Sequence, residues 1–426
     1  MVSADSMAWP DAARDSGPLP RQPPGADSVN RSAAANVLWG KRNWHAQLRG
    51  NSLLRSTLAA GTAALTAVLV GAGPALAAGW TVVPSPPTGQ DAYINGIAAR
   101  TDADAWAVGS VGQQSSKVPS LPLIDHWNGT AWSPSTPPSF PATNGIHLGW
   151  VSSSSATDAW AVGTINLVKH PGYFGPLTVH WDGSTWTNVP DPLPLNPSTA
   201  LVGVADISST NAYAIGNEGS TFGLVEQWNG TAWNRPAAQP PFPMPNGDTF
   251  AQNTVNAISA SSASNVWIVG TYLQTVYGNI WDPYSVHWDG TAWNLVTMPQ
   301  VTGAVFTSAD AISPTNVWAA GNSPSGPLIA HWNGTAWTIT PSPAAGTLTG
   351  ITARSASDVW AVGYTTGPQT LTLHWDGTTW TTVSSPNVGS ASQLTSVSAS
   401  PGGAIVWAAG YSGVSGSFNP LTLQNG

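Results

Sequence analysis

The chain has 426 residues, with 12 lysines and arginines against 20 aspartates and glutamates, and a formal net charge of −8. So few basic side chains argue against nucleic acid and anionic lipid as partners, because binding to phosphate groups depends on their neutralisation by lysine and arginine. The chain has no cysteine, which excludes disulfides and thiol chemistry.

The first 78 residues differ in composition from the rest of the chain. Residues 1–40 are rich in proline, aspartate and arginine and poor in large apolar residues, which predicts disorder. Residues 41–78 combine a basic flank, an apolar run and the small-residue site Ala75-Leu76-Ala77, a pattern typical of a secretory signal peptide. The apolar run from Thr57 to Gly73 is at the lower limit for a membrane span, so an uncleaved anchor is the alternative. We therefore expect a secreted or cell-surface protein, exported by a signal that ends near Ala77.

From residue 79 onward the chain consists of repeats. One phrase, "HWDGTTWTTV" in its last copy, occurs six times at spacings of roughly 43 to 60 residues. The copies begin at His126, His180, Gln227, His287, His331 and His374. Asn-Gly and Asp-Gly favour a two-residue hairpin turn, because both residues tolerate positive φ, and the flanking Trp, Thr and Val favour paired strands. Each copy therefore predicts the end of one strand, a tight turn and the next strand.

A second phrase, "DVWAVG" in one of its copies, precedes each hairpin. Its seven copies end at Gly109, Gly163, Gly216, Gly270, Gly321, Gly363 and Gly410. Before each copy lies a strand-like run of alternating small and apolar residues, such as "LTGITA" from Leu348. Each unit therefore contains four short strands, which is the sequence form of a β-propeller blade.

The number of units predicts how the ring closes. Seven units have the first three strands, but only six have the fourth, and the chain stops at "LTLQNG". The missing strand has its match at the other end, in "GWTVVPSP" from Gly79. We therefore predict an all-β, seven-bladed β-propeller of four-stranded antiparallel blades over residues 79–426. In it, Trp80 to Val83 pair with Leu421 to Gln424 and complete the last blade, so that no long strand edge stays exposed.

Most of the conspicuous side chains belong to the repeat. Nineteen of the 21 tryptophans after residue 78 occupy repeat positions, which predicts core packing between blades. The histidines before "W" recur on separate blades, too far apart to bind one metal ion, so we expect each to hydrogen-bond to a neighbouring strand or turn. The Asp or Asn before "VW" is expected to cap its turn through its own side chain. We accordingly predict no catalytic set, no metal and no cofactor.

The two faces of the predicted ring differ. On one face the turns within each blade are short and nearly invariant, whereas on the other the second-to-third and blade-to-blade loops vary greatly. We call the latter the loop-rich face, and function usually lies on variable loops held by a rigid frame. Aromatic side chains with few charges suit sugars or extended peptides, and packing of the long loops is the alternative. Trp150 is expected on the innermost strand of blade 2, in a position of small residues elsewhere, and Trp281 in the long loop of blade 4. The candidate ligand-binding residues are Trp150, His170, Tyr173, Phe174, Tyr272, Tyr277, Trp281 and Tyr284.

The phrases "DVWAVG" and "HWDGTTWTTV" resemble the repeats of secreted bacterial β-propeller proteins of actinobacterial type, over essentially residues 79–426. Kelch, WD-repeat and sialidase propellers are more distant. Trp375-Asp376 looks like the WD dipeptide but lacks its Gly-His partner, the double glycine of kelch blades is missing, and "HWDGTTW" is one residue shorter than the sialidase Asp-box. The resemblance implies the propeller fold.

We expect an extracellular, monomeric and non-catalytic binding propeller for a glycan, a peptide or a cell-wall or cell-surface component. A sialidase- or glycosidase-like hydrolase is the alternative, and a structural spacer or surface coat is a third possibility. A sialidase clamps its substrate with three arginines, but Arg100 and Arg354 share a repeat position here and leave only Arg235 outside it. A glycosidase needs two convergent carboxylates, and acids such as Asp206 and Asp310 are not paired by any spacing.

Overall fold

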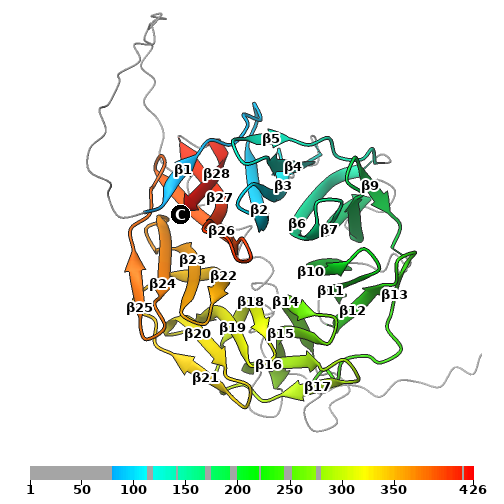
Figure 1. Ribbon diagram of the computed structural model, residues 1–426, viewed down its shortest axis with the longest axis vertical. Coiled ribbons are helices and arrows are strands. Elements are labelled where there is room, and N and C mark those ends of the chain that lie inside the picture. The colour runs from blue at the N-terminus through cyan, green and yellow to red at the C-terminus, as the bar shows by residue number, and fades with distance from the viewer. Residues whose placement is uncertain are drawn as a thin grey trace, which may run out of the picture. The chain divides into compact units, whose positions relative to one another are not determined.

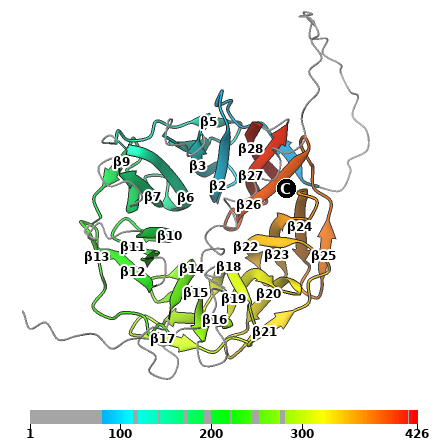
Figure 2. The same ribbon diagram turned by 180° about the vertical axis from the view of Figure 1, so that it is seen from behind.

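The computed structural model describes residues 79–112, 119–140, 143–167, 174–191, 199–219, 222–243, 252–274, 280–414 and 417–426. In these ranges, 28 strands form seven four-stranded antiparallel sheets, which stand as blades around a ring (Figure 1, and from behind in Figure 2). The predicted seven-bladed propeller is thereby confirmed. The segments 1–40 and 41–78, with their predicted disorder and signal peptide, lie outside the described residues. Over the described ranges, no helix has the length and apolar character needed to cross a bilayer.

The strands follow the repeat from blade to blade. Blade 1 contains β2 (Ala92–Thr101), β3 (Asp104–Val111), β4 (Leu121–Trp127) and β5 (Trp132–Pro134). Blade 2 contains β6 (Thr143–Ser155), β7 (Asp158–Leu167), β8 (Phe174–Trp181) and β9 (Trp186–Val189). Blade 3 contains β10 (Ala200–Ser208), β11 (Asn211–Glu218), β12 (Phe222–Trp228) and β13 (Trp233–Asn234). Blade 4 contains β14 (Asn253–Ser262), β15 (Asn265–Gln274), β16 (Ile280–Trp288) and β17 (Trp293–Val296).

Blade 5 contains β18 (Val305–Ser313), β19 (Asn316–Ser323), β20 (Gly326–Trp332) and β21 (Trp337–Thr340). Blade 6 contains β22 (Thr347–Ser355), β23 (Asp358–Tyr364), β24 (Thr370–Trp375) and β25 (Trp380–Val383). Blade 7 contains β26 (Ala391–Ala399), β27 (Val406–Val414), β28 (Ser417–Asn425) and, from the other end of the chain, β1 (Thr81–Val83).

The core lies in the seams, by which we mean the contacts between neighbouring blades. The second strand of each blade is buried on both faces, which explains its continuous apolar run. Its tryptophan meets the two hairpin tryptophans of the next blade: the Trp106 ring centroid lies 5.0 Å from those of both Trp181 and Trp186. Trp160 likewise lies 4.8 Å from Trp228 and Trp233. The repeated tryptophans are therefore seam residues, as predicted.

Closure of the ring depends on contacts between the two ends of the propeller. β1 pairs with β28 in the register Thr81↔Gln424, Val82↔Leu423 and Val83↔Thr422, which confirms the predicted pairing. A second contact was not predicted. Asp102 of blade 1 accepts hydrogen bonds from the Ser400 hydroxyl and from the backbone N–H groups of Ala404 and Ile405, both at 3.0 Å. Blade 1 therefore caps the turn between β26 and β27 of blade 7.

The hairpins at the third-to-fourth strand junctions differ from the predicted two-residue turn. In blade 6, four residues, 376–379, separate β24 from β25. The Asp376 Oδ1 atom accepts hydrogen bonds from the backbone N–H groups of Thr378 and Thr379, both at 2.8 Å. Gly377, which follows Asp376, has a positive φ of 97°. The backbone N–H of Asp376 also donates to the Thr379 carbonyl at 3.3 Å. The prediction was wrong because the Asp or Asn is not a central residue of the turn: it precedes the glycine and accepts the hydrogen bonds of the turn with its side chain.

Candidate functional site

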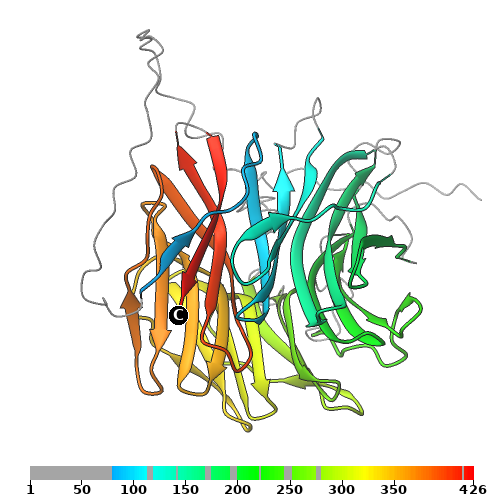
Figure 3. The same ribbon diagram turned by 45° about the horizontal axis from the view of Figure 1, so that its top comes forward.

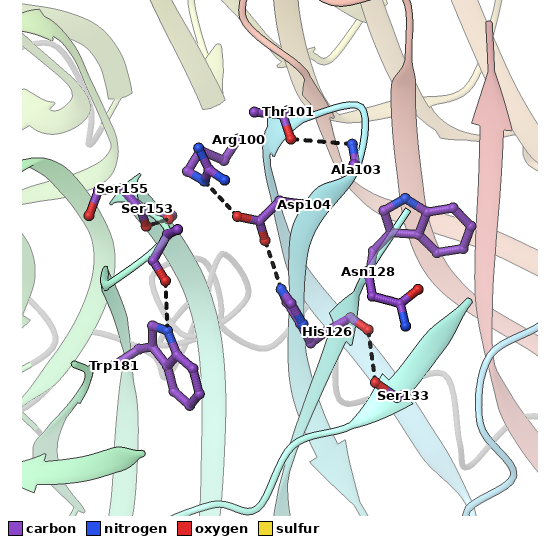
Figure 4. Close-up of polar contacts among 12 residues, drawn as sticks. Arg100, Thr101, Ala103, Asp104, His126, Asn128, Ser133, Ser153, Ser155 and Trp181 are labelled. Carbon is purple, nitrogen blue, oxygen red and sulfur yellow. Dashed lines mark hydrogen bonds and ion pairs between the residues drawn. The ribbon is translucent and has the colours of Figure 1, made fainter. Parts of the chain in front are cut away.

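The recurring polar residues form one repeated contact within each blade. His126 Nε2 lies 2.7 Å from Asp104 Oδ1, and the Arg100 Nε atom donates to the other carboxylate oxygen at 2.5 Å (Figure 4). The same His-to-Asp or His-to-Asn contact joins His180 to Asp158, His287 to Asn265, His331 to Asn316 and His374 to Asp358, at 2.7 to 2.9 Å. The expectation that each histidine bonds to a neighbouring strand or turn is confirmed. These histidines and acids are parts of the scaffold.

The Asp or Asn before "VW" was predicted to cap its own turn, and this prediction was wrong. Its side-chain oxygen bonds to the histidine of the third strand instead. In blades 4 and 6 it also accepts a hydrogen bond from the indole N–H of its own strand, as from Trp360 Nε1 to Asp358 Oδ1 at 2.9 Å. A hydroxyl caps the turn instead: Thr101 Oγ1 accepts from the backbone N–H of Ala103 at 3.2 Å, and Ser355 does so for Ser357 at 3.3 Å. The strand pairing turns the Asp or Asn side chain toward the third strand, so it cannot reach the turn.

The loop-rich face is uneven because, among the described residues, the hairpins between the second and third strands extend further in three blades than in the others. In blade 2 the β7–β8 ladder runs to Asn166↔Phe174, in blade 4 the β15–β16 ladder runs to Gln274↔Ile280, and in blade 7 the β27–β28 ladder runs to Val414↔Ser417. In blade 6 the corresponding ladder already ends at Tyr364↔Thr370. Figure 3 shows the long strands of blades 2 and 7 running from one face of the ring toward the other. We call these three the raised hairpins.

Trp150 lies where it was predicted, on the innermost strand of blade 2. It pairs with Val162, and its half-buried ring packs against the core clusters of two seams, between blades 2 and 3 and between blades 3 and 4. In blades 5 and 7 the same position is a serine, whose hydroxyl accepts from the next blade: Ser308 from Ile351 N at 3.1 Å and Ser396 from Ile97 N at 3.2 Å. Trp150 therefore replaces an inter-blade hydrogen bond with apolar contact.

The structure separates the predicted blade 4 residues. Trp281 is a half-buried residue of β16 and pairs with Leu273, so it lies on a raised hairpin and not in a loop as predicted. Tyr272, on β15, is half-buried, but it pairs with Asp282, so its side chain lies on the other face of the sheet from Trp281. Tyr284 is only 3% exposed, and its hydroxyl donates to the Thr254 carbonyl at 3.2 Å. Tyr284 is a core residue and leaves the candidate site, because it stands where most blades place a buried leucine.

On the remaining blades the described part of the site is apolar. Phe174 begins β8 on the raised hairpin of blade 2 and is half-buried. Leu121 and Phe222 begin the third strands of blades 1 and 3, and they are 56% and 47% exposed, among the largest exposures of apolar side chains on the described surface. His170, Tyr173 and Tyr277, which were also predicted to contact ligand, lie outside the described residues.

Sequence reasoning missed an aromatic cluster on the third raised hairpin. Tyr411 and Phe418 of blade 7 meet Tyr93 of blade 1, with ring centroids 5.1 and 5.3 Å from that of Tyr93. The Tyr411 hydroxyl donates to Gln393 Oε1 at 2.7 Å, and burial raises the pKa of Tyr411 to about 12. The available signal was Tyr93, whose position holds no aromatic carbocycle in the other blades; at the position of Tyr411, blade 6 also has a tyrosine, Tyr364. The meeting of Tyr93 with Tyr411 across the ring closure had no signal in the sequence.

Two of the acids considered for a hydrolase, Asp206 and Asp310, bond to neighbouring blades. Asp310 Oδ2 accepts from the Ala353 backbone N–H at 2.7 Å and from the Thr352 hydroxyl at 3.2 Å, and burial raises the pKa of Asp310. Asp206 Oδ2 accepts from the Ser154 backbone N–H at 2.8 Å. Both carboxyl groups therefore join neighbouring blades, and neither is held toward the loop-rich face.

Comparison with known proteins identifies the fold and no family. Neither a protein-family model nor a curated protein matches the chain. YCF48 from Cyanidioschyzon merolae is similar in structure, with a TM-score of 0.52 and 15% identity over 82% of this chain and 98% of that chain. YCF48 bound to D1 peptide has a TM-score of 0.50 and 15% identity over 81% and 96% of the two chains. U3-55K has a TM-score of 0.51 and 11% identity over 82% and 98%. At such identities the likeness concerns the fold alone, and the resemblance to secreted bacterial repeat proteins stays a prediction.

Proposed function

We propose that the chain is a non-catalytic binding propeller that holds an extended peptide segment of a partner on its loop-rich face. The observation that carries this proposal is the contrast between the two faces. One face presents near-identical turns, capped by Ser or Thr hydroxyls or by Asp or Asn side chains. The other presents raised hairpins with half-buried rings, and exposed apolar side chains at the starts of third strands.

The kind of side chain favours a peptide. Leu121 and Phe222 occupy the same register, two residues before the buried leucines Leu123 and Leu224, so two blades offer an exposed apolar residue at one level of the ring. Aliphatic and aromatic residues together suit the apolar side chains of an extended peptide, whereas sugars are held mainly by aromatic faces and hydrogen bonds. The same fold in YCF48 occurs bound to a peptide.

The absence of catalysis is part of the proposal. The histidines and acids that recur in the sequence have partners within their blades or seams, as with His126 and Asp104 or Asp310 and Ala353. A group engaged in this way is not available to take up or deliver a proton to a ligand on the loop-rich face. We also propose that the protein acts outside the cell, which rests on the signal-like segment 41–78.

The test is binding of the full chain to a library of extended peptides, with a glycan array and a panel of glycosidase substrates in parallel. Trp281→Ala should weaken peptide binding several-fold and leave the melting temperature nearly unchanged, because an aromatic contact contributes about 1 kcal/mol beyond its area. Leu295→Ala is the matched control, because Leu295 is 51% exposed but lies on the outer strand β17 of the same blade.

Three results would contradict the proposal. They are binding to glycans with none to peptides, an equal loss of binding in Leu295→Ala and Trp281→Ala, and turnover of a glycosidase substrate that disappears on mutation of one acidic residue.

A further inference from the structure

The seam between blades 2 and 3 contains two pairs of carboxyl groups. We propose that this seam is a proton-dependent contact: each pair holds the two blades together while it shares a proton, and loss of the two protons loosens the ring at this seam. The inference is independent of what the loop-rich face binds.

The first pair consists of Asp158 in blade 2 and Asp206 in blade 3. Both carboxyl groups are bonded to Ser154, and the charge of Asp158 acts on Asp206. The Asp158 Oδ1 atom lies 2.7 Å from His180 Nε2, and Asp158 Oδ2 accepts a hydrogen bond from the Ser154 hydroxyl at 2.5 Å. Asp206 accepts from Ser154 N at 2.8 Å. The repeat does not require an acid here, because the residues at the position of Asp206 in the other blades are Ala99, Ser153, Ala260, Ala311, Ala353 and Ala399.

The second pair consists of Glu226 on β12 and Asp191, which follows β9 of blade 2. The Glu226 side chain is 0% exposed and lies beside Asp191, and in the described chain no hydrogen-bond donor reaches its two oxygens. Aliphatic residues fill this position in five blades, namely Val179, Val286, Ala330, Leu373 and Leu423. Asp125 occupies it in blade 1.

Two carboxylates in contact inside a seam cannot both be charged at low cost, so one carboxyl of each pair keeps its proton and donates it to the other. Burial first, and then the adjacent carboxylate, raise the pKa of Asp206 and of Glu226. The other charged groups nearby are His180 beside the first pair and Arg235 beside the second. Arg235 is already paired with Glu218 at 2.8 Å, so it neutralises Glu226 incompletely.

The direction of the pH effect follows from these shifts. A carboxyl whose pKa is raised by folding stabilises the folded state fully below its ordinary pKa, near 4, and the contribution is lost as the pH rises through the raised pKa. The seam should therefore be closed at mildly acidic pH and weakened at alkaline pH.

This seam also lacks a contact that several other seams have. In them, a side chain on the innermost strand donates to a backbone carbonyl of the next blade: Asn95 to Leu148 at 3.0 Å, Thr307 to Leu348 at 3.2 Å, Thr349 to Leu394 at 2.8 Å and Thr395 to Ile94 at 2.8 Å. In blade 2 the corresponding residue is Gly149, which has no side chain. With this bond missing, the carboxyl pairs make a larger share of the seam's polar contacts.

Amide hydrogen exchange of the full chain at pH 5 and pH 9, corrected for intrinsic rates, tests the proposal directly. Peptides over residues 148–158 and 200–208 report on the seam, and peptides over 347–355 and 391–399 report on the seam between blades 6 and 7. We expect protection in the first set to fall by roughly tenfold or more, since one pKa unit of linkage corresponds to a factor of ten, and protection in the second set to stay the same. Equal changes in both sets would overturn the proposal.

Variants provide a second, separate measurement. Asp206→Asn combined with Glu226→Gln places an amide donor where each protonated carboxyl stood, so the double variant should keep its seam protection at pH 9. Asp125→Asn is the matched control: burial raises the pKa of Asp125 to about 7, but it lies on blade 1. Replacing the Asp125 carboxyl should leave the pH dependence of amide protection at residues 200–208 as it is in the parent protein. A double variant that still loses protection there between pH 5 and pH 9 would refute the shared-proton mechanism. If the double variant does not fold, the comparison of the two seams in the parent protein still tests the proposal.

Discussion

At the scale of the residue, the propeller satisfies its buried polar groups with one repeated contact. Asp358 shows it most fully, because its carboxylate receives His374 Nε2 and Trp360 Nε1, both at 2.9 Å, and Arg354 Nε at 2.7 Å. Asn265 makes the histidine and indole contacts with an amide, to His287 at 2.7 Å and to Trp267 at 3.0 Å. An amide oxygen therefore suffices for the histidine and indole contacts, and the carboxylate of Asp358 adds an ion pair with Arg354.

This comparison makes a prediction for blade 6. Asp358→Ala should lower the free energy of unfolding by about 2–4 kcal/mol, because it leaves several donors in a partly buried site without an acceptor. Asp358→Asn should lower it by about 1 kcal/mol or less, because the amide oxygen still accepts and only a part-exposed ion pair is lost. Denaturant unfolding of both variants is the measurement. Equal losses would show that the carboxylate charge, and not the acceptor, matters here.

At the scale of the element, the hairpins between third and fourth strands are stabilised by side-chain acceptors and a single glycine. In blade 6, the hydrogen bonds from Thr378 and Thr379 lower the pKa of Asp376 to about 2, and Gly377 has a φ of 97°. A Cβ atom on Gly377 would lie 2.8 Å from the Cβ of Ser357 in the neighbouring turn. Backbone conformation and space both require glycine at this position.

Gly377→Ala should therefore cost about 1–2 kcal/mol of unfolding free energy, from strain at positive φ and from the clash with Ser357. Gly367→Ala in the same blade is the matched control. An added Cβ there would meet nothing closer than Thr365 Oγ1 at 3.9 Å, so the change should be within about 0.5 kcal/mol. Thermal melting of the two variants checks the difference, and a Gly377→Ala protein as stable as the Gly367→Ala protein would contradict the account of the turn.

At the scale of the whole molecule, stability depends on a closed ring. The second-strand tryptophan of most blades is buried against the hairpin tryptophans of the next blade, so an open ring weakens one seam. Closure rests on the β1–β28 ladder, on Trp80, which packs at 5.3 Å against Trp360 of blade 6, and on the Asp102 cap of blade 7. The short strand β1 thus joins the seam between blades 6 and 7 as well as completing a sheet.

Deletion of residues 79–86 should lower the melting temperature sharply and promote aggregation, because it exposes the outer edge of β28 and removes Trp80, which is 5% exposed, from the core. Val82→Ser is the control, since the Val82 side chain is 44% exposed and its backbone hydrogen bonds are kept. Thermal melting and light scattering are the measurements. A deleted chain that melts with the parent and stays monomeric would show that β1 does not close the ring.

The sequence by itself determined the blade count, the four-strand pattern and the strand that closes the ring. These properties rest on local chemistry, in which turn residues, strand residues and seam tryptophans recur with one period. It also identified the repeated histidines as scaffold residues, because one residue type recurs at the same position on separate blades.

Only the tertiary structure decided which side chains reach a surface and which distant residues meet. A strand register that differs by one residue moves a side chain to the other face, so the sequence could not show that Tyr284 is buried while Trp281, three residues earlier, is half-exposed on a raised hairpin. Nor could it bring Tyr93 together with Tyr411, or Glu226 with Asp191, because these contacts form between blades and have no periodic signal. The repeat positions every blade in the same way, and the features that distinguish one blade from another appear where neighbouring blades pack together.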